Sequence, residues 1–158
     1  MKHKLQLFCD PGVYLDRYLN LDKPFRHGPW LYATDGAIIV RVPADDEKEA
    51  VVGVPDPDRV AAIYSNFDAA KCTKPWPRGD ANIGIDRISA NRLELSGCQI
   101  LGNRGIKGIY WLIISLLGDV FYNPDGGKGC GIQFVCNELQ GVVNPVAESV
   151  AELRTLKV

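Results

Sequence analysis

The residues from Lys71 to Arg78 interleave cationic side chains with an aromatic one, Trp76. Lysine and arginine neutralise phosphates, and the face of an indole can stack on a base. This combination predicts a nucleic-acid contact. The same residues would also suit a solvated loop in which Trp76, between Pro75 and Pro77, packs back on the body of the protein, or a contact with a protein partner.

Charge is unevenly distributed around this stretch. Residues 44–70 contain seven acidic and two basic residues, a net charge of −5, and residues 71–107 contain seven basic and three acidic residues, a net charge of +4. The whole chain has 18 basic and 19 acidic residues, which excludes a strongly basic, histone-like binder. We therefore expect salt-sensitive, non-specific DNA binding through the region 71–107. Its candidate contacts are Lys71, Lys74, Trp76, Arg78, Arg87, Arg92, Arg104 and Lys107.

The sequence predicts no catalytic residue, no cofactor and no metal site. Asp35 precedes a glycine, where a turn-forming role is commoner than a catalytic one. Residues 102–105 precede an expected helix and would form either an anion site or a turn at its start. The 158 residues include two histidines and five cysteines without a CxxC pair, so a zinc site is not indicated. The competing class is a small enzyme that uses Asp35, His27 or a cysteine.

The first part of the chain is expected to fold as strand, helix, strand, strand. Lys4–Cys9 is predicted to be a strand, and Tyr14–Leu21 has the apolar spacing of a short helix. Asp35-Gly36 between two β-rich runs predicts a hairpin of Trp30–Thr34 with Ala37–Val42.

The second part of the chain repeats this order. Its expected elements are strands at Ile83–Ile88 and Leu93–Leu101, a helix at Ile106–Leu117, and strands at Asp119–Tyr122, Gly131–Cys136 and Leu139–Val143. The segment between the two parts could hold a further helix within Asp56–Ala70. Two such units side by side predict an α+β fold with one antiparallel sheet and its helices packed on a single face. The chain is expected to form a single domain over 1–158, with possible halves 1–43 and 81–145, a connector 44–80 and a tail 146–158 that could be an amphipathic helix.

The run Tyr32-Ala33-Thr34-Asp35-Gly36, followed by an apolar strand, resembles the "ATDG" hairpin of bacterial DNA sliding clamps, the β subunit of DNA polymerase III. The resemblance implies domains built from two strand-helix-strands units, which close into a ring around duplex DNA. The chain departs from that family in two respects. Its length suffices for one such domain, and its helix Ile106–Leu117 carries Lys107 as its only basic residue.

An apolar helix of this kind requires burial on more than one side, which suits a core or a protein interface. Tyr110, Trp111 and Leu112 are the candidate interface residues, with a second copy of the chain or another protein as partner. No membrane partner is expected, because the longest apolar run, Ile109–Leu117, is about half of a membrane span. The odd number of cysteines, and an N-terminus without a long apolar stretch, predict a cytoplasmic protein.

These observations favour a non-enzymatic binding protein with a clamp-like fold. A small accessory protein of a phage or mobile element, in contact with DNA or a replication-type protein, fits the size and pattern by analogy. An oligomeric structural protein is a further alternative.

Overall fold

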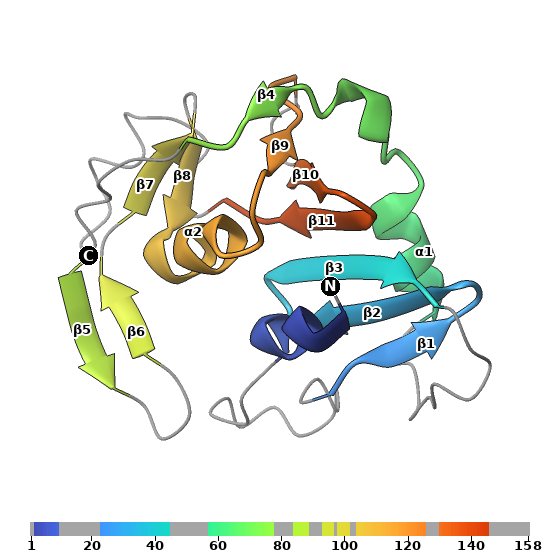
Figure 1. Ribbon diagram of the computed structural model, residues 1–158, viewed down its shortest axis with the longest axis horizontal. Coiled ribbons are helices and arrows are strands. Elements are labelled where there is room, and N and C mark those ends of the chain that lie inside the picture. Colours follow the sequence, from blue (N-terminus) through green and yellow to red (C-terminus); the bar gives the residue numbers. More distant parts are fainter. Residues whose placement is uncertain are drawn as a thin grey trace.

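The computed structural model describes residues 2–9, 23–44, 57–77, 84–88, 93–96, 98–101, 104–125 and 130–145. The expected helix Tyr14–Leu21, the tail from residue 146 and residues 45–56 and 78–80 of the connector lie outside the described residues. The elements, shown in Figure 1, are the 3-10 helices η1 (Lys2–Phe8) and η2 (Ala69–Lys71), the α-helices α1 (Pro57–Tyr64) and α2 (Gly108–Ser115), and the strands β1 (Phe25–His27), β2 (Trp30–Thr34), β3 (Ile38–Pro43), β4 (Lys74–Pro75), β5 (Gly84–Ile88), β6 (Leu93–Ser96), β7 (Cys98–Leu101), β8 (Arg104–Lys107), β9 (Phe121–Tyr122), β10 (Ile132–Cys136) and β11 (Leu139–Val143).

Within the described residues, seven strands form one sheet in the order β1-β2-β3-β11-β10-β9-β4, and every neighbouring pair is antiparallel. Two separate hairpins, β5-β6 and β7-β8, lie beside α2 at the left of Figure 1. The predicted α+β class with an antiparallel sheet is confirmed.

The hairpin predicted at Asp35-Gly36 is confirmed. β2 and β3 pair from Trp30↔Pro43 to Thr34↔Ile39. The Asp35 carboxylate accepts hydrogen bonds from the backbone N–H groups of Ala37 (2.9 Å) and Ile38 (3.2 Å) through Oδ1. Gly36 has a φ of 98°, which glycine adopts without steric cost. Asp35 therefore has the turn-forming role that its sequence context favours.

The hairpins β2-β3 and β10-β11 are related by an approximate two-fold axis. Ala33 pairs with Val40, and Phe134 pairs with Gly141 at the same sequence offset. The two hairpins join through their second strands, where Val40 pairs with Gly141, so this pair lies at the centre of the relation. A positive φ occurs at the equivalent turn positions, Gly36 and Asn137.

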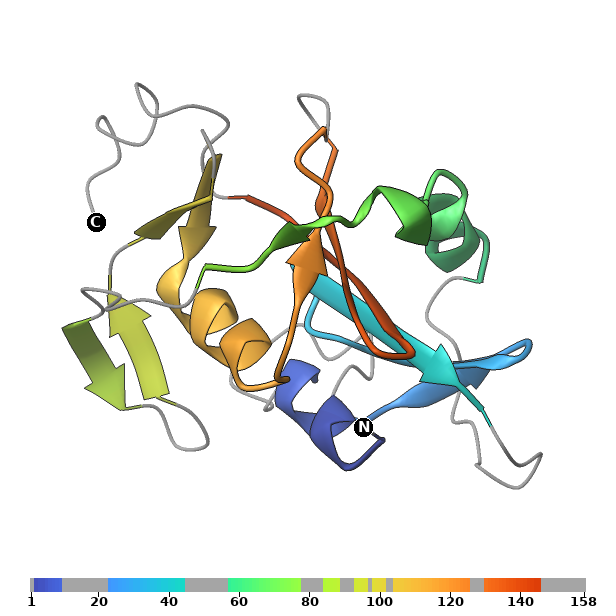
Figure 2. The ribbon, with the colours of Figure 1, turned by 45° about the horizontal axis from the view of Figure 1, so that its top comes forward.

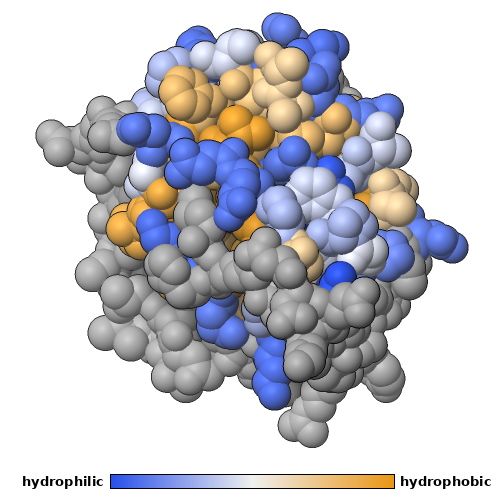
Figure 3. All heavy atoms as spheres, turned by 45° about the vertical axis from the view of Figure 1, so that its right-hand side comes forward, coloured by the Kyte–Doolittle hydropathy of each residue, from blue (hydrophilic) through white to orange (hydrophobic). Residues whose placement is uncertain are grey.

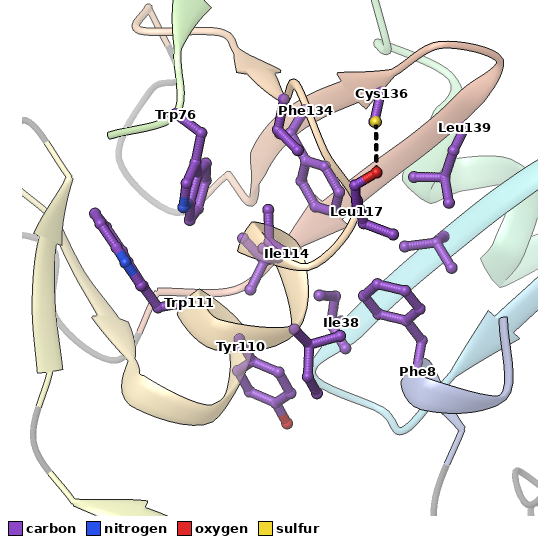
Figure 4. Close-up of a cluster of buried hydrophobic side chains, with 14 of the residues drawn as sticks. Phe8, Ile38, Trp76, Tyr110, Trp111, Ile114, Leu117, Phe134, Cys136 and Leu139 are labelled. Carbon is purple, nitrogen blue, oxygen red and sulfur yellow. Dashed lines mark hydrogen bonds between the residues drawn. The ribbon is translucent and has the colours of Figure 1, made fainter. Parts of the chain in front are cut away.

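The larger core lies on the face of the sheet that η1 and α2 cover. It includes Leu5 and Phe8 of η1, Ile114 of α2, and the inward-facing Val40 and Phe134, each no more than 1% exposed. Residues from both ends of the described chain thus share one apolar cluster, part of which is shown in Figure 4.

The smaller core lies on the opposite face, beneath α1. Val60 and Tyr64, one helical turn apart, pack with Tyr32, Ile39 and Val142. The single-face prediction concerned the helices Tyr14–Leu21 and Ile106–Leu117, of which the first lies outside the described residues, and the two described α-helices lie on opposite faces. The reason is that β3 is apolar on both sides: Val40 faces α2, while Ile39 needs the cover that α1 provides.

The prediction of a strand at Lys4–Cys9 is wrong, because η1 is helical. Leu5 and Phe8, three residues apart, are both buried, and a 3-10 helix aligns such positions on one side. In a strand the side chains of Leu5 and Leu7 would lie on the same face and both would be buried, but Leu7 is 44% exposed.

The region around α2 differs from its prediction in two ways. Ile106 and Lys107 belong to β8, which pairs with β7 from Cys98↔Lys107 to Leu101↔Arg104, and α2 starts only at Gly108. Of the predicted helix-entry residues 102–105, Arg104 and Gly105 therefore lie in a strand, and residues 102 and 103 lie outside the described residues. The predicted strand Leu93–Leu101 is divided into β6 and β7, which belong to different hairpins.

Candidate nucleic-acid interface

The segment from Asp68 to Trp76 presents two lysines on a firmly held backbone. Asp68 caps η2 by accepting a hydrogen bond from the Ala70 N–H at 3.0 Å, and the Trp76 N–H donates to the Val120 carbonyl at 2.8 Å. Lys71 and Lys74 are exposed. In Figures 1 and 2 the segment runs from the α1 side of the molecule across β9 toward α2.

Trp76 lies in the core and not on the surface. Its side chain is 5% exposed and contacts the rings of Trp111, Tyr122 and Phe134, with centroid distances of 5.0, 5.9 and 6.2 Å. Figure 4 shows the indole directed toward Trp111 of α2. Its Nε1–H has no hydrogen-bond partner in the described part of the chain. A ring packed in this way offers no open face to a base, so its position corresponds to the packing alternative.

The remaining predicted cations are dispersed over several elements. Arg104 and Lys107 are the half-buried first and last residues of β8, and Arg104 donates a hydrogen bond to the Cys130 carbonyl. Arg87 lies in β5. Arg78 and Arg92 lie outside the described residues. Of the eight predicted contacts, Lys71 and Lys74 are thus the two that the structure places close together and exposed.

The predicted interface residues occupy two environments. Tyr110 and Trp111 are 6% and 7% exposed and belong to the larger core, whereas Leu112 is 36% exposed on the outer side of α2. One helical turn on, Leu116 is 56% exposed. Leu112 is therefore the member of the predicted set that a partner could reach.

A pocket of about 400 Å³ lies where the β2-β3 turn meets the start of α2. Its lining includes Asp35, Lys107, Tyr110 and Asn144. The Tyr110 hydroxyl donates to Asp35 Oδ2 at 2.6 Å, while Asp35 Oδ1 holds the turn. Both carboxylate oxygens thus hold structural hydrogen bonds, which fix the β2-β3 turn against α2.

The thiols offer no metal site in the part of the chain that the structure describes, since no cluster of three His, Cys, Asp or Glu residues occurs there. Burial raises the pKa of the Cys72 thiol to about 11, and the nearby Asp68 carboxylate adds to this shift. Burial also raises the pKa of Cys136, whose Sγ lies 3.5 Å from the Leu117 carbonyl oxygen (Figure 4).

Arg41 is a residue of the α1 face that its sequence context does not single out. Its guanidinium carbon lies 4.0 Å from the centroid of the Trp30 ring and 3.9 Å from that of the Tyr64 ring. Its Nε donates to Gln140 Oε1 at 2.9 Å, and its Nη1 lies 3.4 Å from the Tyr32 hydroxyl. The feature of the sequence that could have drawn attention to Arg41 is that it is the only charged residue in the otherwise apolar strand β3.

Comparisons with known proteins identify no relative, since no family model, curated protein or solved structure matches this chain. Among the described helices, none combines the length and the apolar character that a bilayer crossing requires.

Proposed function

We propose that the chain is a non-enzymatic binding protein with a clamp-like domain, and that its ligand is the backbone of duplex DNA. The observation that carries the proposal is the alternation within residues 71–76. Cys72 and Trp76 are buried, so they anchor the segment, and Lys71 and Lys74 project from it into solvent. A fixed backbone reduces the entropy that each lysine loses on contact with a phosphate.

The clamp-like part of the proposal is supported by the strand order. The strands β1-β2-β3 and β9-β10-β11 are two sets of three, joined through their last strands, and α2 precedes the second set. Two three-stranded sets are one part of the two-unit pattern that the Tyr32–Gly36 resemblance implies. The opening strand and helix of the first unit do not contribute to this support, because Lys2–Phe8 is helical and Tyr14–Leu21 lies outside the described residues. A clamp-like route for DNA across α2 lacks support, because α2 contains no lysine or arginine and six of its eight residues are buried.

The test is the salt dependence of binding to a short duplex. The variant with Lys71, Lys74 and Arg78 all changed to Ala should bind more weakly. Its slope of log affinity against log salt should fall by about 0.9 for each lost phosphate contact. Lys23→Ala, at an exposed lysine outside the segment, is the matched control and should leave the slope unchanged. Binding that ignores salt, or that survives the triple change, would refute the proposal.

A second measurement addresses the assembly. Sedimentation with and without the duplex should give a closed oligomer, or a mass shift on adding DNA. A monomer or dimer whose mass does not change with DNA would contradict the clamp-like assembly, and the similarity to sliding clamps would then be limited to the order of the strands.

A further inference from the structure

The half-buried Arg41 has no carboxylate partner in the described part of the chain. Its contacts there are two aromatic rings and two neutral acceptors, the Gln140 amide oxygen and the Tyr32 hydroxyl. A guanidinium carries five N–H groups, and the two on Nη2 donate to no residue of the described chain. Half-buried charges are normally compensated, so this cation is suited to bind an anion that none of the described residues supplies.

The surroundings of Arg41 also fix its orientation. The rings of Trp30 and Tyr64 both contact the guanidinium group, and the Gln140 side chain accepts a hydrogen bond from its Nε. Tyr64 is itself fixed, because its hydroxyl lies within hydrogen-bond distance of the backbone carbonyl oxygens of Gln140 (3.0 Å) and Ile39 (3.3 Å). A planar, pre-oriented fork of donors matches the oxygens of a phosphate and loses little entropy on binding.

The segment Tyr64–Lys71 begins at a residue that contacts Arg41 and ends at Lys71. The Tyr64 ring contacts Arg41 and also packs against Phe67, with centroids 5.4 Å apart. The following backbone is fastened to β10, since Gln133 accepts from the Asp68 N–H at 3.2 Å and donates to the Asn66 carbonyl at 3.1 Å. Lys71 comes directly after, in η2. Figure 3 views this α1 side, where hydrophilic side chains lie among apolar ones.

We propose that Arg41 is a phosphate-binding residue, oriented by its contacts with Trp30, Tyr64 and Gln140. Its phosphate is the backbone group of the DNA strand that also contacts Lys71, so this identification of the source rests on the proposed function. The same chemistry would accept a free phosphate ion, and the two sources are separated by experiment. Asp58 and Asp68 also lie on this side of the molecule, but the Asp68 carboxylate is engaged with the Ala70 N–H.

The first experiment titrates the ¹⁵N-labelled protein with inorganic phosphate and follows the indole N–H signal of Trp30, assigned with Trp30→Phe. Trp30 is half-buried beside Arg41, whereas Trp76 and Trp111 are in the core and serve as internal controls. We expect a saturable shift of the Trp30 signal alone. In Arg41→Gln the apparent affinity for phosphate should fall by about tenfold or more, as expected for a lost charge-assisted hydrogen bond.

The second variant, Arg41→Lys, keeps the charge but not the planar fork. It should bind phosphate less tightly than the wild type and better than Arg41→Gln, and it keeps the test informative if Arg41→Gln fails to fold. A Trp30 signal unaffected by phosphate, or an equal response in all three proteins, would overturn the proposal and leave Arg41 with a packing role only.

The DNA measurement then identifies the source. With the duplex, Arg41→Gln should reduce the salt slope by about 0.9, whereas Lys23→Gln should not. If the phosphate response depends on Arg41 but the wild-type protein binds no DNA, the Arg41 site stands with free phosphate as its ligand, and only the proposed function fails. If DNA binds and Arg41→Gln leaves the slope unchanged, the assignment of Arg41 to the DNA backbone is overturned.

Discussion

At the centre of the sheet, Gly141 lies directly opposite Phe134. A Cβ atom at position 141 would lie only 2.2 Å from Cζ of the Phe134 ring. The two-fold equivalents of Phe134 and Gly141 are Ala33 and Val40, so the small and the large residue exchange strands between the hairpins. In one pair the large side chain belongs to the first strand of the hairpin, as Phe134 does, and in the other pair it belongs to the second strand, as Val40 does.

Gly141→Ala should therefore destabilise the protein, by about 1–3 kcal/mol, because the ring of Phe134 must leave its position in the core. Urea unfolding measures the change. Phe134→Leu in the same chain should recover part of the loss, giving a favourable coupling between the two sites in a double-mutant cycle. Strictly additive effects would show that the ring and the added methyl group do not compete for space.

The hydrogen bond from Tyr110 to Asp35 joins α2 to the β2-β3 turn. Tyr110→Phe should reduce the free energy of unfolding by about 1–2 kcal/mol, because it removes a donor from a carboxylate. In an Asp35→Asn background the cost of Tyr110→Phe should be smaller, since the acceptor is then neutral. An equal cost in both backgrounds would mean that the charge of Asp35 does not strengthen this bond.

The buried thiol of Cys72 makes stability depend on pH in the alkaline range. Its pKa in the folded protein is raised from the ordinary 9.0 to about 11, so the folded state favours the protonated thiol. The resulting stabilisation is complete below pH 9 and is lost as the pH rises from 9 to 11. Wild type should thus lose stability over this range more steeply than Cys72→Ala, in urea unfolding at several pH values. Parallel pH profiles of the two proteins would contradict this.

At the scale of the elements, turn chemistry was the most reliable guide. Asp35-Gly36 located the first hairpin, because few other residues adopt its turn geometry, and alternation located β10 and β11. The errors came from contacts distant in sequence. η1 is helical because Leu5 and Phe8 fill a core built by later strands, and Arg104–Lys107 forms a strand because it pairs with β7.

The candidate interface was predictable to a similar extent. The composition of Lys71–Arg78 identified two exposed lysines, but it could not show that Trp76 is covered by Trp111, Tyr122 and Phe134, which lie 35 or more residues later in the chain. The role of Arg41 could not be predicted from any repeating pattern of residues in the sequence. Its aromatic neighbours come from β2 and α1, and only the tertiary fold brings them together.

Adjacent residues of α2 should respond very differently to truncation. Trp111→Ala should cost about 3–5 kcal/mol, since the ring is 7% exposed and packs on Trp76. Leu112→Ala should cost less than about 1 kcal/mol, because its side chain is already at the surface. Urea unfolding compares the two. Leu112→Glu, followed by sedimentation, then tests the predicted interface: a soluble protein of lower mass supports it, and an unchanged mass opposes it.

At the scale of the whole molecule, the described residues of the two halves share one core. Val40 and Val42 of the first hairpin share the larger cluster with Phe134 and Leu139 of the second, and β3 pairs with β11 along four residues. The first hairpin alone would expose β3 as a long apolar edge, with its backbone N–H and C=O groups unpaired.

Because the two hairpins depend on each other in this way, the chain should unfold in one cooperative transition. Far-ultraviolet circular dichroism, which follows the sheet, and tryptophan fluorescence, which follows Trp76 and Trp111 in the core, should give the same midpoint in urea. A fragment of residues 1–77 should show no such transition, and a folded, cooperatively melting fragment would demonstrate that the first half is an independent unit.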